Sequence, residues 1–177
     1  MKILFIDGTA GFSPDRLESR PTGGILTSLT LIPRQLARQG HDVFVASVHP
    51  TVEFWRGVRY VPLSQIGELV PDLVVFNRNS IARNSGEHFQ RANPVVKIWW
   101  WLHDIVDHRY LADDGFKAAD KIIALSSYQA WAYGDFYDLP EQKFVCIPNG
   151  VDKAVFFPPE TEIDRDPSLF LHASAPV

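Results

Sequence analysis

Residues 2–8 read KILFIDG, a short apolar run that starts almost at the first residue and ends at an aspartate and a glycine. Such a run is typical of a strand buried on both faces, as in a parallel sheet. The glycine pair of TGGIL (residues 22–26) then opens a segment whose apolar residues recur at helical spacing as far as Gly40, and VFVASV (residues 43–48) follows as a second buried strand. This order predicts a βαβ unit with a right-handed crossover. Thr22 is a candidate cap for the helix and Pro33 a candidate kink.

The alternation of buried strands and helices continues beyond this unit. Further strands are predicted at residues 58–63, 72–76, 95–101, 121–125 and 143–147. Helices are predicted at residues 81–92, near 115–120 and at 128–137, with one or two helical turns at 64–69. Ser126 and Ser127 are plausible caps for the helix at 128–137, whose aromatic residues we assign to the core. The pattern predicts a doubly wound α/β domain with a parallel, Rossmann-like sheet.

A change of composition marks a domain boundary near residue 158. Residues 1–157 form the predicted Rossmann-like domain, and the proline-rich and charged residues 158–167 form a predicted linker. Residues 168–177 then begin another strand-like run without a neighbour in this chain. We expect this run to be the first strand of a second domain, the rest of which the chain lacks.

Composition and charge narrow the class of protein. The 177 residues are 46% hydrophobic and 21% charged, as in soluble globular proteins. The formal net charge of −4 gives no indication of the clustered basic surface that binds nucleic acid, so we expect no nucleic-acid partner. The N-terminus lacks the pattern of a signal peptide, which favours a cytoplasmic protein, with peripheral membrane contact still open. Cys146 lies between apolar neighbours, and we expect it to be a small buried hydrophobe.

The stretch Trp99-Trp100-Trp101-Leu102-His103-Asp104 concentrates the chemistry of the chain. Successive strand side chains face opposite sides of a sheet, so the tryptophans are expected to fill both halves of the core, and only Trp101 is a candidate to reach a cleft. His103 and Asp104 follow at the carboxyl end of the strand, where open α/β sheets bind ligands.

Asp107 and His108 extend this stretch into a compact His/Asp cluster, which leaves a metal site as an alternative. Histidine and carboxylate suit zinc, iron or manganese. A strand end in an α/β context, without further ligands on surrounding helices, favours a site without metal.

Four short motifs carry a resemblance to a known family. In chain order they are Thr22-Gly23-Gly24, the run LARQGHDV at residues 36–43, His103-Asp104, and the run IPNGVD at residues 147–152. Together they resemble the N-terminal domain of a GT-B-fold glycosyltransferase, closest to the retaining family 4 type, over residues 1 to about 157. Residues 169–177 resemble the opening strand of the family's second domain, which mainly holds the donor nucleotide.

The resemblance implies roles for particular residues. Gly23 and Gly24 would bind the donor diphosphate at a helix N-terminus, because a phosphate can approach amides that carry no Cβ. His103 would be the catalytic residue in the cleft between the domains, facing the donor sugar and its phosphate. Asp104 would bind substrate or cap the next turn.

Other substrate-binding candidates lie on the same rim of the sheet or at the hinge. Arg78, which follows Asn77, would meet an anionic donor or acceptor, and Asn149 would fix the turn that leads to the second domain. The first loop, which begins at Asp7, helps shape the acceptor pocket in this family. The sequence assigns no role to Asp7 or Asn77.

The implied function is transfer of a sugar, with retention, from a nucleotide-sugar donor to a sugar, lipid or glycan acceptor. The nucleotide sugar would be a co-substrate, with no metal and no other cofactor. Two alternatives remain, namely a nucleotide-sugar epimerase of related architecture and a non-catalytic α/β binding module.

Overall fold

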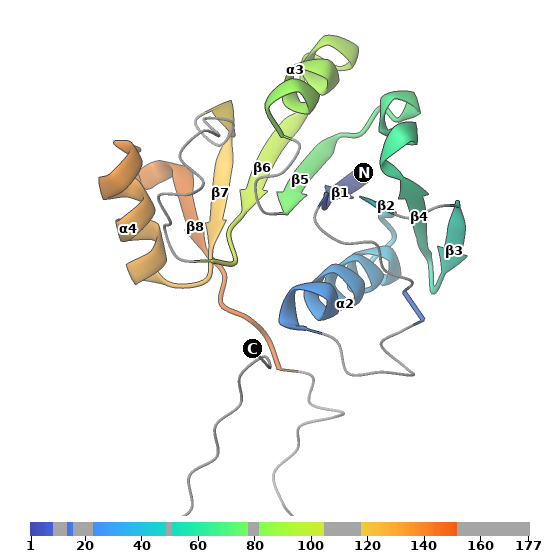
Figure 1. The fold of residues 1–177 in the computed structure, drawn as a ribbon, viewed down its shortest axis with the longest axis horizontal. Coiled ribbons are helices and arrows are strands. Elements are labelled where there is room, and N and C mark those ends of the chain that lie inside the picture. The colour runs from blue at the N-terminus through green and yellow to red at the C-terminus, as the bar shows by residue number, and fades with distance from the viewer. Residues whose placement is uncertain (9–13, 16–22, 49–50, 78–81, 105–117, 152–177) are drawn as a thin grey trace, which may run out of the picture.

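The computed structural model describes residues 1–8, 14–15, 23–48, 51–77, 82–104 and 118–151, and Figure 1 shows their arrangement. They form one eight-stranded sheet in the order β3-β4-β2-β1-β5-β6-β7-β8. All neighbouring strands are parallel except β3 and β4. The strands are β1 (Lys2–Ile6), β2 (Asp42–Ser47), β3 (Glu53–Trp55), β4 (Val58–Pro62), β5 (Leu73–Asn77), β6 (Lys97–Trp101), β7 (Lys121–Ala124) and β8 (Phe144–Cys146).

Helices lie on both faces of this sheet, as the doubly wound prediction requires. They are α2 (Gly24–Arg38), α3 (Ala82–Ala92) and α4 (Ser127–Tyr137), with two short 3₁₀ helices, η1 (Leu63–Glu68) and η4 (Glu141–Lys143). Residues of η1, α3 and α4 pack against one core cluster, and residues of α2 pack against the other. The chain places β2 and β4 on one side of β1 and then returns to add β5 on the other side. The switch point of the fold therefore lies between β1 and β5.

The three consecutive tryptophans of β6 divide between the two core clusters. Trp100 is fully buried on the face covered by η1, α3 and α4, and its ring lies 5.7 Å from the ring of Phe76. Trp99 and Trp101 pack on the opposite face with α2. This division follows from the two-residue period of a strand and confirms their predicted place in the core.

The predicted strand at residues 95–101 begins two residues later than expected. Val95 is 79% exposed. Asn93 holds a turn there, since its carbonyl accepts from the amide of Val96 at 3.0 Å and its side-chain oxygen accepts from the amide of Val95 at 3.3 Å. The turn uses the two backbone amides that a longer strand would need for its ladder, so β6 starts at Lys97.

Two expectations of burial are wrong. Cys146 is exposed, because β8 is the last strand of the sheet and has no neighbour on its outer side among the described residues. In α4, Tyr128 and Trp131 are exposed, whereas Tyr133 and Tyr137 pack against the core. The aromatic residues of α4 point in several directions around the helix, so only part of them can face the sheet.

The helix boundaries match the prediction more closely. Ser126 caps α4 by accepting a hydrogen bond from the amide of Gln129. Pro33 is buried inside α2 without ending it, and Gly40 follows the helix with a φ of 89°. The N-cap position of α2 is Gly23, which provides no side-chain cap, and Thr22, the predicted cap, lies outside the described residues.

Several other predictions lie outside the described residues. They concern most of the helix near 115–120, the linker at 158–167 and the strand-like run at 168–177. Within the part of the chain that the structure describes, no helix is both long and apolar enough to cross a membrane.

Candidate functional site

Polar side chains collect at the edge of the sheet where the central parallel strands end. Asp7 follows β1, Ser47 is the last residue of β2, Asn77 is the last residue of β5, and His103 follows β6 by two residues. These four strands are consecutive neighbours in the sheet. Helix α2 begins on the side of the sheet toward which the arrows of β5 and β6 point (Figure 1). The switch point between β1 and β5 thus lies at the centre of this group.

A chain of hydrogen bonds links three of these side chains. The amide nitrogen of Asn77 donates to Oδ2 of Asp7 at 2.5 Å, and the amide oxygen of Asn77 lies 2.6 Å from Nε2 of His103. Asp7 is 1% exposed and Asn77 is 2% exposed, whereas His103 is half-buried. The histidine is therefore tied through a buried amide to a buried carboxyl group.

The direction of these bonds sets the proton on His103. The amide nitrogen of Asn77 can only donate, so it must face Asp7, and its oxygen must then accept from His103. Nε2 of His103 consequently carries a hydrogen.

The ring of His103 is also supported by Trp101. Their ring centroids lie 4.6 Å apart at an interplanar angle of 44°. Trp101 is buried, and among the described residues its indole nitrogen has no hydrogen-bond partner, nor does the buried hydroxyl of Ser47. Buried polar atoms in proteins are almost always partnered. Both atoms belong to residues that end strands at the edge that carries His103.

The turn after His103 is held by α4. The backbone carbonyl of Asp104 accepts from the side-chain amide of Gln129 at 2.8 Å and from the hydroxyl of Tyr133 at 3.3 Å. The side-chain oxygen of Gln129 in turn accepts from the amide of Leu125 at 2.7 Å. Asp104 thus contributes its backbone to the local structure, while its side chain is exposed and its predicted contact with substrate stays a prediction.

Gly23 and Gly24 lie at the exposed start of α2. Gly23 has a φ of −64°, so its backbone does not require glycine, and α2 has no acidic residue in its first turn. A Cβ built on either glycine meets no atom within 4 Å. The space next to these two amides is therefore not filled by described parts of the protein, and their predicted contact with a diphosphate stays a prediction.

The remaining predicted residues are less informative. Arg78 lies outside the described residues. Asn149 is exposed in an irregular segment, and Gly150 does not adopt a positive φ, so this turn does not depend on the freedom of glycine. Where residues are described, no group of three His, Cys, Asp or Glu side chains is placed to hold a metal ion. Asp107 and His108, on which the metal alternative also depends, lie outside that part.

The structure adds Asp7 and Asn77 to the site. The sequence placed both at the ends of predicted strands without giving them a role. Their position directly after two apolar runs was the available signal, because the carboxyl ends of neighbouring parallel strands meet at one edge of a sheet. That the two strands are neighbours is a result of the topology.

Comparison with solved structures finds a protein with a similar fold. The chain is similar to the apo form of the lipopolysaccharide outer core galactosyltransferase WaaB, with a TM-score of 0.60 and 18% sequence identity over 85% of this chain and 46% of that chain. This chain thus spans about half the length of that protein, and the likeness shows a common fold. The predicted fold class, a doubly wound Rossmann-like half of a GT-B architecture, is confirmed. No family model and no curated protein matches the chain.

Proposed function

We propose that this chain is the acceptor-side domain of a retaining glycosyltransferase, which moves a sugar from a nucleotide-sugar donor to a sugar, glycan or lipid-linked acceptor. In this reaction the bond between the sugar C1 and the diphosphate breaks, and an acceptor oxygen forms the new bond to C1. The diphosphate leaves with the electron pair of the broken bond and takes up the proton of the acceptor hydroxyl. A second domain would hold the donor nucleotide, and no metal ion is required.

The observation that carries the proposal is the hydrogen-bond chain from His103 through Asn77 to Asp7. It fixes the imidazole at the carboxyl edge of the sheet, next to the switch point where α/β folds bind ligands. The similarity to a galactosyltransferase supports a sugar nucleotide as the ligand, as an inference from the fold.

His103 would contact the donor through its imidazole ring, which Asn77 holds at Nε2. An imidazole at this position can form a hydrogen bond with a sugar hydroxyl or with a phosphate oxygen. We assign to the imidazole the positioning of the donor sugar at the cleft. The amides of α2 next to Gly23 and Gly24 would stabilise the charge that develops on the diphosphate.

The test uses the full-length product of the gene, assayed for turnover of a panel of UDP-, GDP- and ADP-sugars. The His103→Ala variant is expected to lower kcat by about 10²–10³, the usual cost of losing one preorganised group. His88→Ala, which removes an exposed histidine of α3, is the matched control and should retain full activity. Normal turnover by His103→Ala would refute the proposal, and donor binding without turnover by the parent would favour the non-catalytic module.

A second variant tests the glycine pair without disturbing the fold. Gly24→Ala is expected to leave the stability unchanged or slightly raised, because the added methyl group meets no atom within 4 Å and alanine favours a helix. The same methyl group would hinder a phosphate at the helix N-terminus. The donor KM should rise by about tenfold, which corresponds to about 1.4 kcal/mol of lost binding, with little change in kcat. An unchanged donor KM would exclude this contact.

A further inference from the structure

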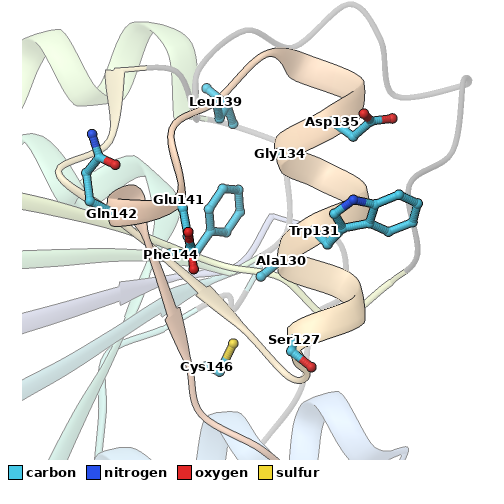
Figure 2. A pocket seen from close by; sticks show the side chains of 10 residues that line it. All are labelled: Ser127, Ala130, Trp131, Gly134, Asp135, Leu139, Glu141, Gln142, Phe144 and Cys146. Atoms are coloured by element: carbon cyan, nitrogen blue, oxygen red, sulfur yellow. The ribbon is translucent and has the colours of Figure 1, made fainter.

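A pocket of about 760 Å³ lies between α4 and the edge of the sheet at β8, outside the site around His103. Five of its lining residues belong to α4, and five come from residues 139–146 (Figure 2). The volume is within the usual range for small-molecule sites, about 300–1,000 Å³. None of Asp7, Asn77 and His103 lines it.

The pocket combines an apolar floor with an exposed aromatic wall. The ring of Phe144 packs close to Gly134, where a Cβ would lie 3.6 Å from the ring. Trp131 is 62% exposed, whereas the other four tryptophans of the chain are buried or half-buried. Tyr128 lies next to Trp131, with 5.7 Å between ring centroids and an angle of 40°. The indole of Trp131 is thus exposed beside a second aromatic ring.

The polar side chains of the pocket are acidic or neutral. Asp135 stands one helical turn after Trp131 on the same side of α4, and Glu141 lies on the side of β8 (Figure 2). Gln142 adds an amide, and none of the described residues that line the pocket is a Lys, Arg or His. The two carboxylates disfavour phosphates and other anions in the pocket. They are good acceptors for hydroxyl groups, each with several lone pairs.

We propose that this pocket binds a neutral carbohydrate. A sugar ring has a face of C–H groups, which suits the negative face of an indole, and a rim of hydroxyl groups, which donate to carboxylates. The sugar would lie against Trp131 with hydroxyls on Asp135, and a further unit would extend toward Glu141. An extended peptide added to β8 is a weaker fit, because this edge strand has only three residues.

This inference goes beyond the proposed function, because it uses a different pocket and needs no donor, no second domain and no turnover. Binding of a sugar here is a property of the chain itself. It can therefore hold or fail independently of the chemistry at His103.

The test is a titration of the ¹⁵N-labelled chain with glucose, galactose, mannose, N-acetylglucosamine and a trisaccharide of each, followed by the indole N–H signal of Trp131. At least one of these probes is expected to shift that signal with a dissociation constant on the order of 1 mM. Trp131→Ala and Asp135→Asn should each weaken binding by at least about tenfold, as followed by the backbone amides of α4. Phe54→Ala, which removes a 70% exposed aromatic ring at the opposite edge of the sheet, should have no effect.

Other outcomes would overturn the proposal. It fails if no probe shifts the Trp131 signal at about 50 mM, or if binding persists unchanged in Trp131→Ala. It also fails if inorganic phosphate shifts this signal more strongly than the sugars do, or if the chain forms a dimer that Trp131→Ala dissociates, because a second copy would then cover the pocket. His103→Ala should leave the shift of the Trp131 signal unchanged, which separates this pocket from the proposed transfer reaction.

Discussion

Replacing Asn77 by alanine should both destabilise the domain and release His103 from its fixed tautomer. Asn77 is 2% exposed and joins two groups that belong to different strands, at 2.5 Å from Asp7 and 2.6 Å from His103. Its removal leaves a buried carboxyl group without this donor and an imidazole N–H without this acceptor. The loss of a hydrogen bond to a buried group costs part of the desolvation free energy of that group.

The size of the expected loss in unfolding free energy follows from the two hydrogen bonds that Asn77 makes. A hydrogen bond to a charged group contributes about 1.5–3 kcal/mol and one between neutral groups about 0.5–1.5 kcal/mol. The free energy of unfolding of Asn77→Ala should therefore be lower by about 2–4 kcal/mol. With a urea m-value of about 2 kcal/mol per M, the midpoint of unfolding should fall by about 1–2 M.

Two measurements check this expectation. Urea unfolding followed by far-UV circular dichroism gives the change in stability, and Asn149→Ala is the matched control because Asn149 is exposed. The control should change stability by no more than about 0.5 kcal/mol. The ¹⁵N shifts of the His103 ring, recorded where the ring is neutral, should show hydrogen on Nε2 in the parent and a mixture of both tautomers in Asn77→Ala.

The reasoning is refuted if the parent carries the hydrogen on Nδ1, or if Asn77→Ala unfolds at the same urea concentration as the parent. A loss of stability with an unchanged tautomer would mean that Asn77 supports Asp7 alone. The hydrogen-bond chain would then have no role in orienting His103.

Two further predictions concern the scaffold. Burial, and to a lesser extent the carboxylate of Glu53, raise the pKa of Tyr60 above its ordinary value near 10. Above about pH 10 the unfolded chain loses this proton while the folded chain keeps it, so the free energy of unfolding should fall as the pH rises. The fall should be less steep in Tyr60→Phe. Equal slopes of unfolding free energy against pH in the two proteins, measured by urea unfolding, would contradict this. Ser126→Ala should cost about 1 kcal/mol through loss of the cap on α4, whereas Ser127→Ala, one residue later, should cost clearly less in the same assay. Equal losses would argue against a cap.

Periodicity alone was enough to predict the architecture. The strands β1, β2 and β5 are continuous apolar runs that end at polar residues, and the alternation with helices led directly to a doubly wound sheet. The three-residue strand β3 was missed, because it is short and depends on a turn in which Arg56 and Gly57 both have positive φ. Such a turn is specified by pairing with β4 as much as by local sequence.

Burial was harder to predict than secondary structure. Cys146 and Trp131 both lie in apolar surroundings in the sequence, yet both are exposed, since β8 is the edge of the sheet and α4 turns only part of its surface toward the core. Which strand forms an edge depends on the order of strands in space. The composition of a short stretch of sequence does not specify that order.

The sequence by itself determined the type of sheet, the position of His103 at the end of a strand, and the division of the tryptophans between two core layers, because these follow from the two-residue period and from where apolar runs stop. Only the tertiary structure decided that Asn77 and Asp7 hold His103 and that a pocket forms beside Trp131. Asp7 and Asn77 are 70 residues apart, and they meet because β5 pairs with β1 across the switch point. The contacts that orient the site are therefore a consequence of strand order, which the fold as a whole establishes.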